Sequence, residues 1–195
     1  MKIGIRRVVT GHDANGKAVI VSDGAAPFVY ENPAIPDMVS TDIWRTAEMP
    51  AAIVKSASET TLGPRRQLPA KNGTVIRINS FPPDPQGIAG MTPAEARQAF
   101  AALGNESAAT FGKGGRHPMM HRTETIDYAI VLSGEIDMVL DETDVHLTEG
   151  DVVVQCGTNH AWVNRSSKPC RIAFILIDGK FDSEVLELIQ DSGLK

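Results

Sequence analysis

Two stretches of the chain decide its fold: GRHPMMHRTETIDYAIVLSG over residues 115–134 and GDVVVQCGTNHAWVN over residues 150–164. Both contain short runs of β-branched residues bounded by glycine. From residue 122 onward, turn-forming residues recur every six to ten positions, which is typical of an all-β sandwich or barrel. This pattern predicts strands at residues 128–132, 135–140, 145–147, 152–155, 160–164 and 171–177.

Histidines cluster in the same two stretches, and this clustering is the main clue to function. Three of the five histidines lie there, at His117, His121 and His160. In the first stretch, five, one, three and six residues separate Gly115, His121, Thr123, Asp127 and Gly134. In the second stretch, Gly150-Asp151 is followed by Gln155, Gly157, His160 and Asn164.

These stretches resemble the two sequence motifs of the cupin superfamily, whose members are small jelly-roll β-barrels. The resemblance implies that His121 and His160 occupy the places of two metal-binding histidines, and Asp127 that of a metal-binding glutamate. Gly134 and Asn164 match the glycine and asparagine of the motifs. The motifs themselves cover residues 115–164, and the flanking strands extend the resemblance to residues 73–179.

The chain departs from these motifs in four places. Thr123 stands where the family has a further histidine, and Asp127 is one methylene shorter than the family's glutamate. In the second motif the gap after Gly150 is one residue short, and Gln155 replaces the usual proline. These changes bear on the metal site more than on the fold.

The remaining ligand set has three interpretations. Two imidazoles and one carboxylate form a set that leaves open positions on a divalent metal such as Fe(II). His121, Asp127 and His160 are therefore the predicted metal ligands and catalytic residues, with Fe, Mn, Ni or Zn as the metal. The same groups can instead work without metal as a general acid and base, because the pKa of an imidazole lies near 7. In the third interpretation they are structural polar residues.

Four further residues are candidates for the pocket. Thr123 shares a strand face with His121 and would point at the metal, and Glu124 is a reserve carboxylate. Trp162 shares the face of His160, where it can form an apolar wall or simply pack the barrel. Arg77 lies on one face of a predicted strand at residues 74–81 and can bind a substrate carboxylate if that face is interior. An edge strand with Arg77 in solvent is the favoured alternative.

The rest of the chain is expected to surround the barrel. Residues 1–72 form an N-terminal β extension packed on the barrel or on a partner subunit, with a hairpin of strands 3–10 and 17–22 and short strands at 42–45 and 52–55. Residues 73–179 form the barrel, with a helical insertion at about 92–104 that begins with the capping sequence Thr92-Pro93-Ala94-Glu95. Residues 180–195 form a C-terminal helix, and both helices are expected to be peripheral.

Composition excludes some classes of partner. The chain of 195 residues carries 19 Lys and Arg against 24 Asp and Glu, so it has no positive excess for a nucleic acid backbone. Its apolar runs are too short to cross a membrane. Cys156 and Cys170 suit a reducing compartment and are predicted to be small buried hydrophobes, and we expect a cytoplasmic protein.

These features predict an all-β cupin jelly-roll barrel with an N-terminal β extension and two short peripheral helices. The resemblance implies a small-molecule enzyme with a metal-assisted site in the barrel mouth. Its substrate would be a small organic acid, phenol or sugar derivative, and its reaction that of an oxygenase, isomerase, decarboxylase or lyase. The alternative is a non-catalytic ligand-binding or sensory cupin that has lost its metal site. A homodimer formed through the N-terminal strands is expected.

Overall fold

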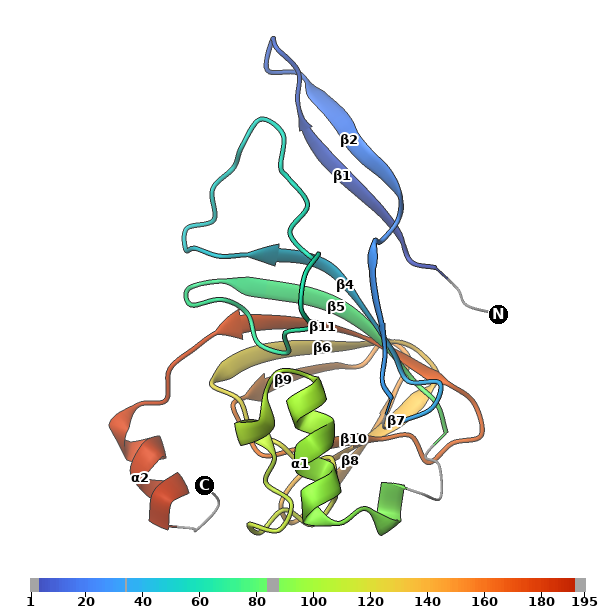
Figure 1. The fold of residues 1–195 in the computed structure, drawn as a ribbon, viewed down its shortest axis with the longest axis vertical. Coiled ribbons are helices and arrows are strands. Elements are labelled where there is room, and N and C mark those ends of the chain that lie inside the picture. The colour runs from blue at the N-terminus through green and yellow to red at the C-terminus, as the bar shows by residue number, and fades with distance from the viewer. Residues whose placement is uncertain (1–3, 34, 84–87, 192–195) are drawn as a thin grey trace.

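The computed structural model describes residues 4–33, 35–83 and 88–191. In chain order its strands are β1 (Arg6–His12), β2 (Ala18–Ala25), β3 (Phe28–Glu31), β4 (Val39–Thr46), β5 (Thr74–Phe81), β6 (Thr125–Ser133), β7 (Glu135–Val139), β8 (Asp144–Thr148), β9 (Val152–Cys156), β10 (Ala161–Val163) and β11 (Cys170–Asp178) (Figure 1). The α-helices are α1 (Pro93–Ala102) and α2 (Ser183–Asp191), and the short 3-10 helices are η1 (Ile88–Gly90) and η2 (Glu106–Ala108). No helix among the described residues is long and apolar enough to cross a membrane.

Two antiparallel sheets form the jelly-roll barrel. The larger sheet has six strands in the order β3-β4-β5-β11-β6-β9, and the smaller has three in the order β10-β7-β8. Side chains from both sheets share one core, which joins Val131 of β6 and Ile172 of β11 to Ile136 and Met138 of β7. The predicted all-β jelly-roll fold is confirmed.

Strand register brings polar residues onto the inner face of the larger sheet. Across the sheet, Val75 of β5 pairs with Leu176 of β11, which pairs with Asp127 of β6. Arg77 lies two residues further along β5, on the same face as Val75. The inner face of this sheet therefore carries a buried arginine and a buried aspartate among apolar side chains.

The motif residues Gly134 and Asn164 hold turns. Gly134 joins β6 to β7 with a φ of 79°, a left-handed conformation that favours glycine. A Cβ atom at this position would lie 2.9 Å from the carbonyl oxygen of Pro169, so space as well as backbone conformation calls for glycine. The Asn164 amide donates to the carbonyls of Phe81 and Lys168, at 3.0 and 2.7 Å, and so ties the end of β10 to the end of β5.

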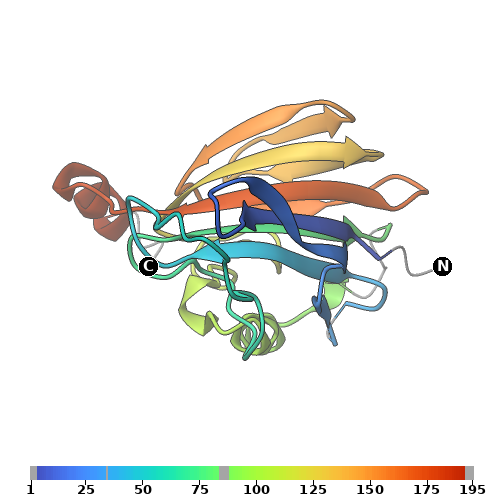
Figure 2. The same ribbon diagram turned by 90° about the horizontal axis from the view of Figure 1, so that it is seen from above.

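Helix α1 begins as predicted with a capping box. The Thr92 hydroxyl accepts from the Glu95 amide, and the Glu95 carboxylate accepts from the Thr92 amide. The helix buries Ala96, Ala99 and Phe100 and lies close to the barrel, whereas α2 lies at the far end of the larger sheet (Figures 1 and 2). Helix α1 is thus not simply peripheral, because Phe100 reaches the pocket described below.

The N-terminal hairpin stands apart from the two large sheets. Strands β1 and β2 form a sheet of their own, which extends away from the barrel (Figure 1). Arg7 anchors it through a two-point ion pair with Glu59, at 2.5 Å for the closer contact, and through a bond to the Ile43 carbonyl. Strands β3 and β4 belong instead to the barrel's larger sheet. The division at residues 72/73 and 179/180 stays a prediction.

Several predicted details are wrong. Residues 52–55 form no strand, and the strand β3 was missed because Pro27 and Pro33 obscure its four residues. Cys170 is buried as expected, but Cys156 is exposed because it ends β9 with its side chain on the outer face. Arg77 is not in solvent: β5 is an inner strand between β4 and β11. Residues 1–3 and 192–195 of the predicted terminal elements lie outside the described residues.

Candidate active site

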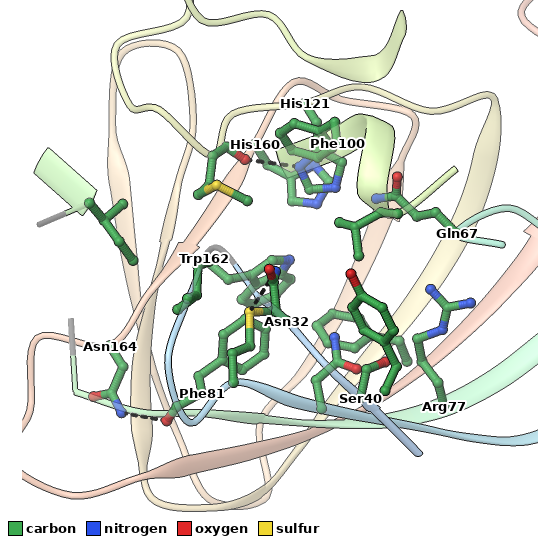
Figure 3. A pocket seen from close by; sticks show the side chains of 18 of the residues that line it. Asn32, Ser40, Gln67, Arg77, Phe81, Phe100, His121, His160, Trp162 and Asn164 are labelled. Atoms are coloured by element: carbon green, nitrogen blue, oxygen red, sulfur yellow. Dashed lines mark hydrogen bonds between the residues drawn. The ribbon is translucent and has the colours of Figure 1, made fainter. Parts of the chain in front are cut away.

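A cavity of about 120 Å³ lies between the two sheets (Figure 3). An engineered apolar cavity of about 150 Å³ can hold benzene, so this space suits a small organic molecule. Its wall comes from β3, β4, β5, β6, β10 and β11, from α1 and from the segment before β6. It is lined by Tyr30, Asn32, Ile35, Met38, Ser40, Arg65, Gln67, Arg77, Asn79, Phe81, Pro82, Ile88, Phe100, Leu103, His117, Met119, His121, Asp127, His160, Trp162, Asn164, Phe174 and Leu176.

Two imidazoles meet on the wall of this cavity. The backbones of His121 and His160 exchange two hydrogen bonds, at 2.9 and 3.0 Å, and form an antiparallel bridge. This pairing places the two ring centroids 4.4 Å apart. Phe100 of α1 covers His121 with its ring centroid 5.0 Å away, and Trp162 lies against His160 at 5.9 Å. The sequence prediction that His121 and His160 converge from separate segments is therefore realised.

Both imidazoles are held neutral and in one orientation. His121 Nδ1 lies 3.0 Å from the Met119 carbonyl oxygen, and His160 Nδ1 lies 2.9 Å from that of Thr158. A carbonyl can only accept, so each Nδ1 donates and each Nε2 keeps its lone pair. Burial lowers the pKa of both rings; for His160 burial and then the neighbouring His121 lower it to about 3. Each ring therefore presents a proton-accepting nitrogen.

Asp127 lines the same cavity from β6. Burial raises its pKa to about 6, although Thr125 and the positive charge of Arg77 act in the opposite direction. Its Oδ1 atom is buried and has no hydrogen-bond partner. This carboxyl group can therefore hold or release a proton near neutral pH.

The predicted three-ligand metal site requires three ligating side chains to meet at one point. Within residues 4–33, 35–83 and 88–191, no three His, Cys, Asp or Glu side chains gather closely enough to hold a metal ion. His121 and His160 offer two nitrogens, but Asp127 does not join them in such a group. Catalytic metal sites commonly use three protein ligands. The described residues thus do not fit the predicted site.

The other predicted pocket residues separate into two pairs. Thr123 is buried but does not line the cavity, because its hydroxyl bonds that of Thr125 at 2.8 Å. It lies outside regular β6, so strand alternation does not carry over from His121. Glu124 is exposed and accepts a hydrogen bond from the Phe181 amide, which removes it as a reserve carboxylate. Trp162 and Arg77 do line the cavity.

Sequence reasoning missed much of the opposite wall. Tyr30, Asn32, Ser40 and Gln67 come from the N-terminal 72 residues, and Phe100 comes from α1. A narrow apolar stripe with Phe100 at its centre was visible in the sequence of α1. No comparable signal marked the N-terminal residues, because their role depends on the pairing of β4 with β5.

Fold and site together define a jelly-roll barrel protein with a small-molecule pocket. A model of the cupin domain matches residues 93–177. The "Phomopsin biosynthesis cluster protein D" of Diaporthe leptostromiformis is 32% identical over 182 residues, which cover 89% of this chain and 78% of that protein. The chain belongs to the cupin family.

Two further matches are more distant. The "Cupin-domain-containing oxidoreductase fogC" of Aspergillus ruber is 27% identical over 187 residues, which cover 90% of this chain and 74% of that protein. Among solved structures, the cupin domain of Schizosaccharomyces pombe Cnp3 aligns with a TM-score of 0.44 at 10% identity, covering 97% of this chain and 95% of that one.

Proposed function

We propose that this protein is a small-molecule enzyme whose active site is the barrel cavity, with His121 and His160 as its reactive pair. The observation that carries the proposal is the pair itself: two neutral imidazoles, 4.4 Å apart, with Nδ1 tied to the backbone and Nε2 left to accept a proton. Relatives named as an oxidoreductase and as a biosynthesis cluster protein support small-molecule chemistry.

The reaction class that these groups support is proton transfer, as in an isomerase, lyase or decarboxylase. His121 is the better placed base, since His160 is more deeply buried and its pKa is lowered to about 3. Asp127, whose pKa is raised to about 6, can return a proton to the product. Phe100 and Trp162 exclude water around the imidazoles, which strengthens their interaction with a bound substrate.

The test combines metal analysis with turnover. The intact chain, purified without chelators, is analysed for bound Fe, Mn, Ni and Zn. It is then incubated with small organic acids, phenols and sugar derivatives, and products are followed by mass spectrometry. His121→Asn and His160→Asn keep a donor near the Nδ1 position but remove Nε2. His146→Asn, at an exposed position of β8, is the matched control.

We expect turnover of at least one compound, a loss of at least 100-fold in His121→Asn and His160→Asn, and full activity in His146→Asn. Unchanged turnover in both pocket variants would overturn the proposal. Binding without turnover of any compound would support the non-catalytic alternative instead. A stoichiometric metal lost in both variants would restore the metal-assisted interpretation.

We also propose that the protein is a homodimer formed through the N-terminal hairpin. Every residue of β2 is exposed, including Val19, Ile20 and Val21, and Val8 of β1 is 45% exposed. Val19 and Val21 share one face of the strand and Ile20 lies on the other, so both faces of the hairpin expose apolar side chains, which are typical of interaction sites. Light scattering should give twice the chain mass at micromolar concentration, and Ile20→Asp should give the monomer. A monomeric wild-type protein would contradict the proposal.

A further inference from the structure

A group of charged side chains lies at the side of the cavity away from the histidine pair. Asp42 of β4 contacts three arginines. Its Oδ2 lies 2.6 Å from Arg45 Nη2, and its Oδ1 lies 3.1 Å from Arg77 Nε and 3.7 Å from Arg65 Nη1. We call these four residues the arginine cluster. All four side chains are largely buried, with exposed fractions of 2 to 15%.

The arginine cluster has more positive than negative charge. It holds three guanidinium groups and one carboxylate, and the imidazoles of His121 and His160 are neutral. Asp127 is the acidic residue among the described side chains that line the cavity, and its pKa of about 6 limits how much negative charge it adds. Even with Asp127 ionised, the positive charges outnumber the negative by one. Buried charge without a partner is unfavourable, so this excess favours a bound anion.

Two arginines of the cluster face the cavity with unused donors. Arg65 and Arg77 line it, whereas Arg45 does not. Arg77 uses Nη2 to bond the Arg66 carbonyl, and its buried Nε has no hydrogen-bond partner, although it lies 3.1 Å from Asp42 Oδ1. Arg65 donates from its two Nη atoms to Arg66 and Ser40, and its buried Nε has no partner. Burial and the charge of Arg65 lower the pKa of Arg77 to about 9, which an anion would reverse.

The wall between the arginines and the histidines is aromatic. Phe174 lies edge-on to both Trp162 and Phe81, with ring centroids 5.3 and 6.2 Å away. Figure 3 shows Arg77, Ser40 and Phe81 on one side of the cavity, His121 and His160 on the other, and Trp162 between the two sides. A ligand that spans this space meets positive charge at one end and apolar surface along its body.

We infer that the cavity binds a small carboxylate with an apolar or aromatic body, whose carboxylate is held by Arg77 and Arg65 and whose other end reaches His121 and His160. Arginine recognises carboxylates through charge-assisted, often two-point hydrogen bonds. This inference rests on the proposed function, because it assigns the substrate class of the same site.

The test compares benzoate with benzamide, which has the same shape and no charge, by calorimetry and by tryptophan fluorescence, to which Trp44 and the cavity residue Trp162 both contribute. Wild type should bind benzoate at least tenfold more tightly than benzamide. Arg77→Gln should abolish this preference, and Arg65→Gln serves if Arg77→Gln does not fold. Arg45→Gln is the matched control: it removes the same charge from the cluster but not from the cavity wall, and should keep the preference.

Equal binding, or no binding, of the two probes by wild type would overturn the inference, as would an unchanged preference in a folded Arg77→Gln. Inorganic phosphate binding as tightly as benzoate would overturn the carboxylate assignment. Turnover separates this inference from the proposed function. If benzoate binding depends on the arginines but no acid is turned over, the carboxylate site is supported and the proposed enzyme function is not. If neutral compounds are turned over and benzoate does not inhibit their turnover, the enzyme function is supported and the carboxylate site is not.

Discussion

His121 and His160 face each other across a two-residue antiparallel bridge, each backbone donating a hydrogen bond to the other's carbonyl. The residues are 39 positions apart in the chain. Because the bridge fixes both backbones and the Nδ1 bonds fix both rings, the pair is built before any ligand binds. Preorganisation of this kind reduces the cost of orienting groups for reaction.

His160 should make the protein sensitive to acid. The pKa of His160 is about 3 in the folded protein, whereas an ordinary histidine, as in the unfolded chain, has a pKa of 6.5. Between these two pH values the unfolded chain binds more protons than the folded protein. The free energy of unfolding therefore falls as pH drops below 6.5. At pH 5 the free energy of unfolding should be lower by about 2 kcal/mol than at neutral pH. His160→Asn should reduce the stability difference between pH 7.5 and 5 by that amount in urea unfolding. If wild type and His160→Asn lost the same stability between pH 7.5 and pH 5, the prediction would be wrong. His146→Asn is the control.

Asp127 should act in the opposite direction. Its pKa is raised from 3.8 to about 6, so the folded protein retains a proton that the unfolded chain releases, and stability falls as pH rises from about 4 through 6. The free energy of unfolding should decrease by about 3 kcal/mol over this pH range because of Asp127. Asp127→Asn lacks this change, so its stability relative to wild type should be higher at pH 8 than at pH 4. Equal relative stability at the two pH values would show that Asp127 titrates normally.

The capping box of α1 should contribute to stability and to closure of the cavity. Thr92→Ala removes the side chain that accepts from the Glu95 amide and should cost about 1 kcal/mol in thermal or urea unfolding. Because α1 carries Phe100 over His121, amide exchange in α1 should also become faster. Thr92→Ser keeps the hydroxyl and should behave as wild type. No loss in Thr92→Ala would mean that packing alone holds the helix.

The ion pair between Arg7 and Glu59 should hold the hairpin against the molecule. Arg7 lowers the pKa of Glu59 to about 2, so the contribution of this pair is complete above pH 4.5 and is lost as pH falls towards 2. At pH 7, Glu59→Gln should speed amide exchange in β1 and β2 several-fold and leave β5 and β11 unchanged. Asp23→Asn breaks only the exposed pair with Arg6 and is the control. If amide exchange in β1 and β2 were unchanged in Glu59→Gln, contacts other than this ion pair would hold the hairpin.

Much of the fold was accessible from the sequence because its signals are local. Turn residues and β-branched runs predicted six strands of the barrel, and Thr92-Pro93-Ala94-Glu95 predicted the start of α1. The alternation of Val75, Arg77, Asn79 and Phe81 on one face of β5 was also correct. Periodicity of this kind reports the direction of a side chain relative to its own strand.

By itself the sequence determined the barrel through its strand pattern, and it predicted the convergence of His121 with His160 through its resemblance to the cupin motifs. Only the tertiary structure decided that Asp127 forms no three-ligand group with the histidines among the described residues, that Glu124 is exposed, and that Arg77 is buried against Asp42. The physical reason is that alternation specifies a face but no distance across the barrel. Distances depend on strand order and curvature, and the charge on Arg77 is stabilised by Asp42, 35 residues away in the chain and adjacent only through the pairing of β4 with β5.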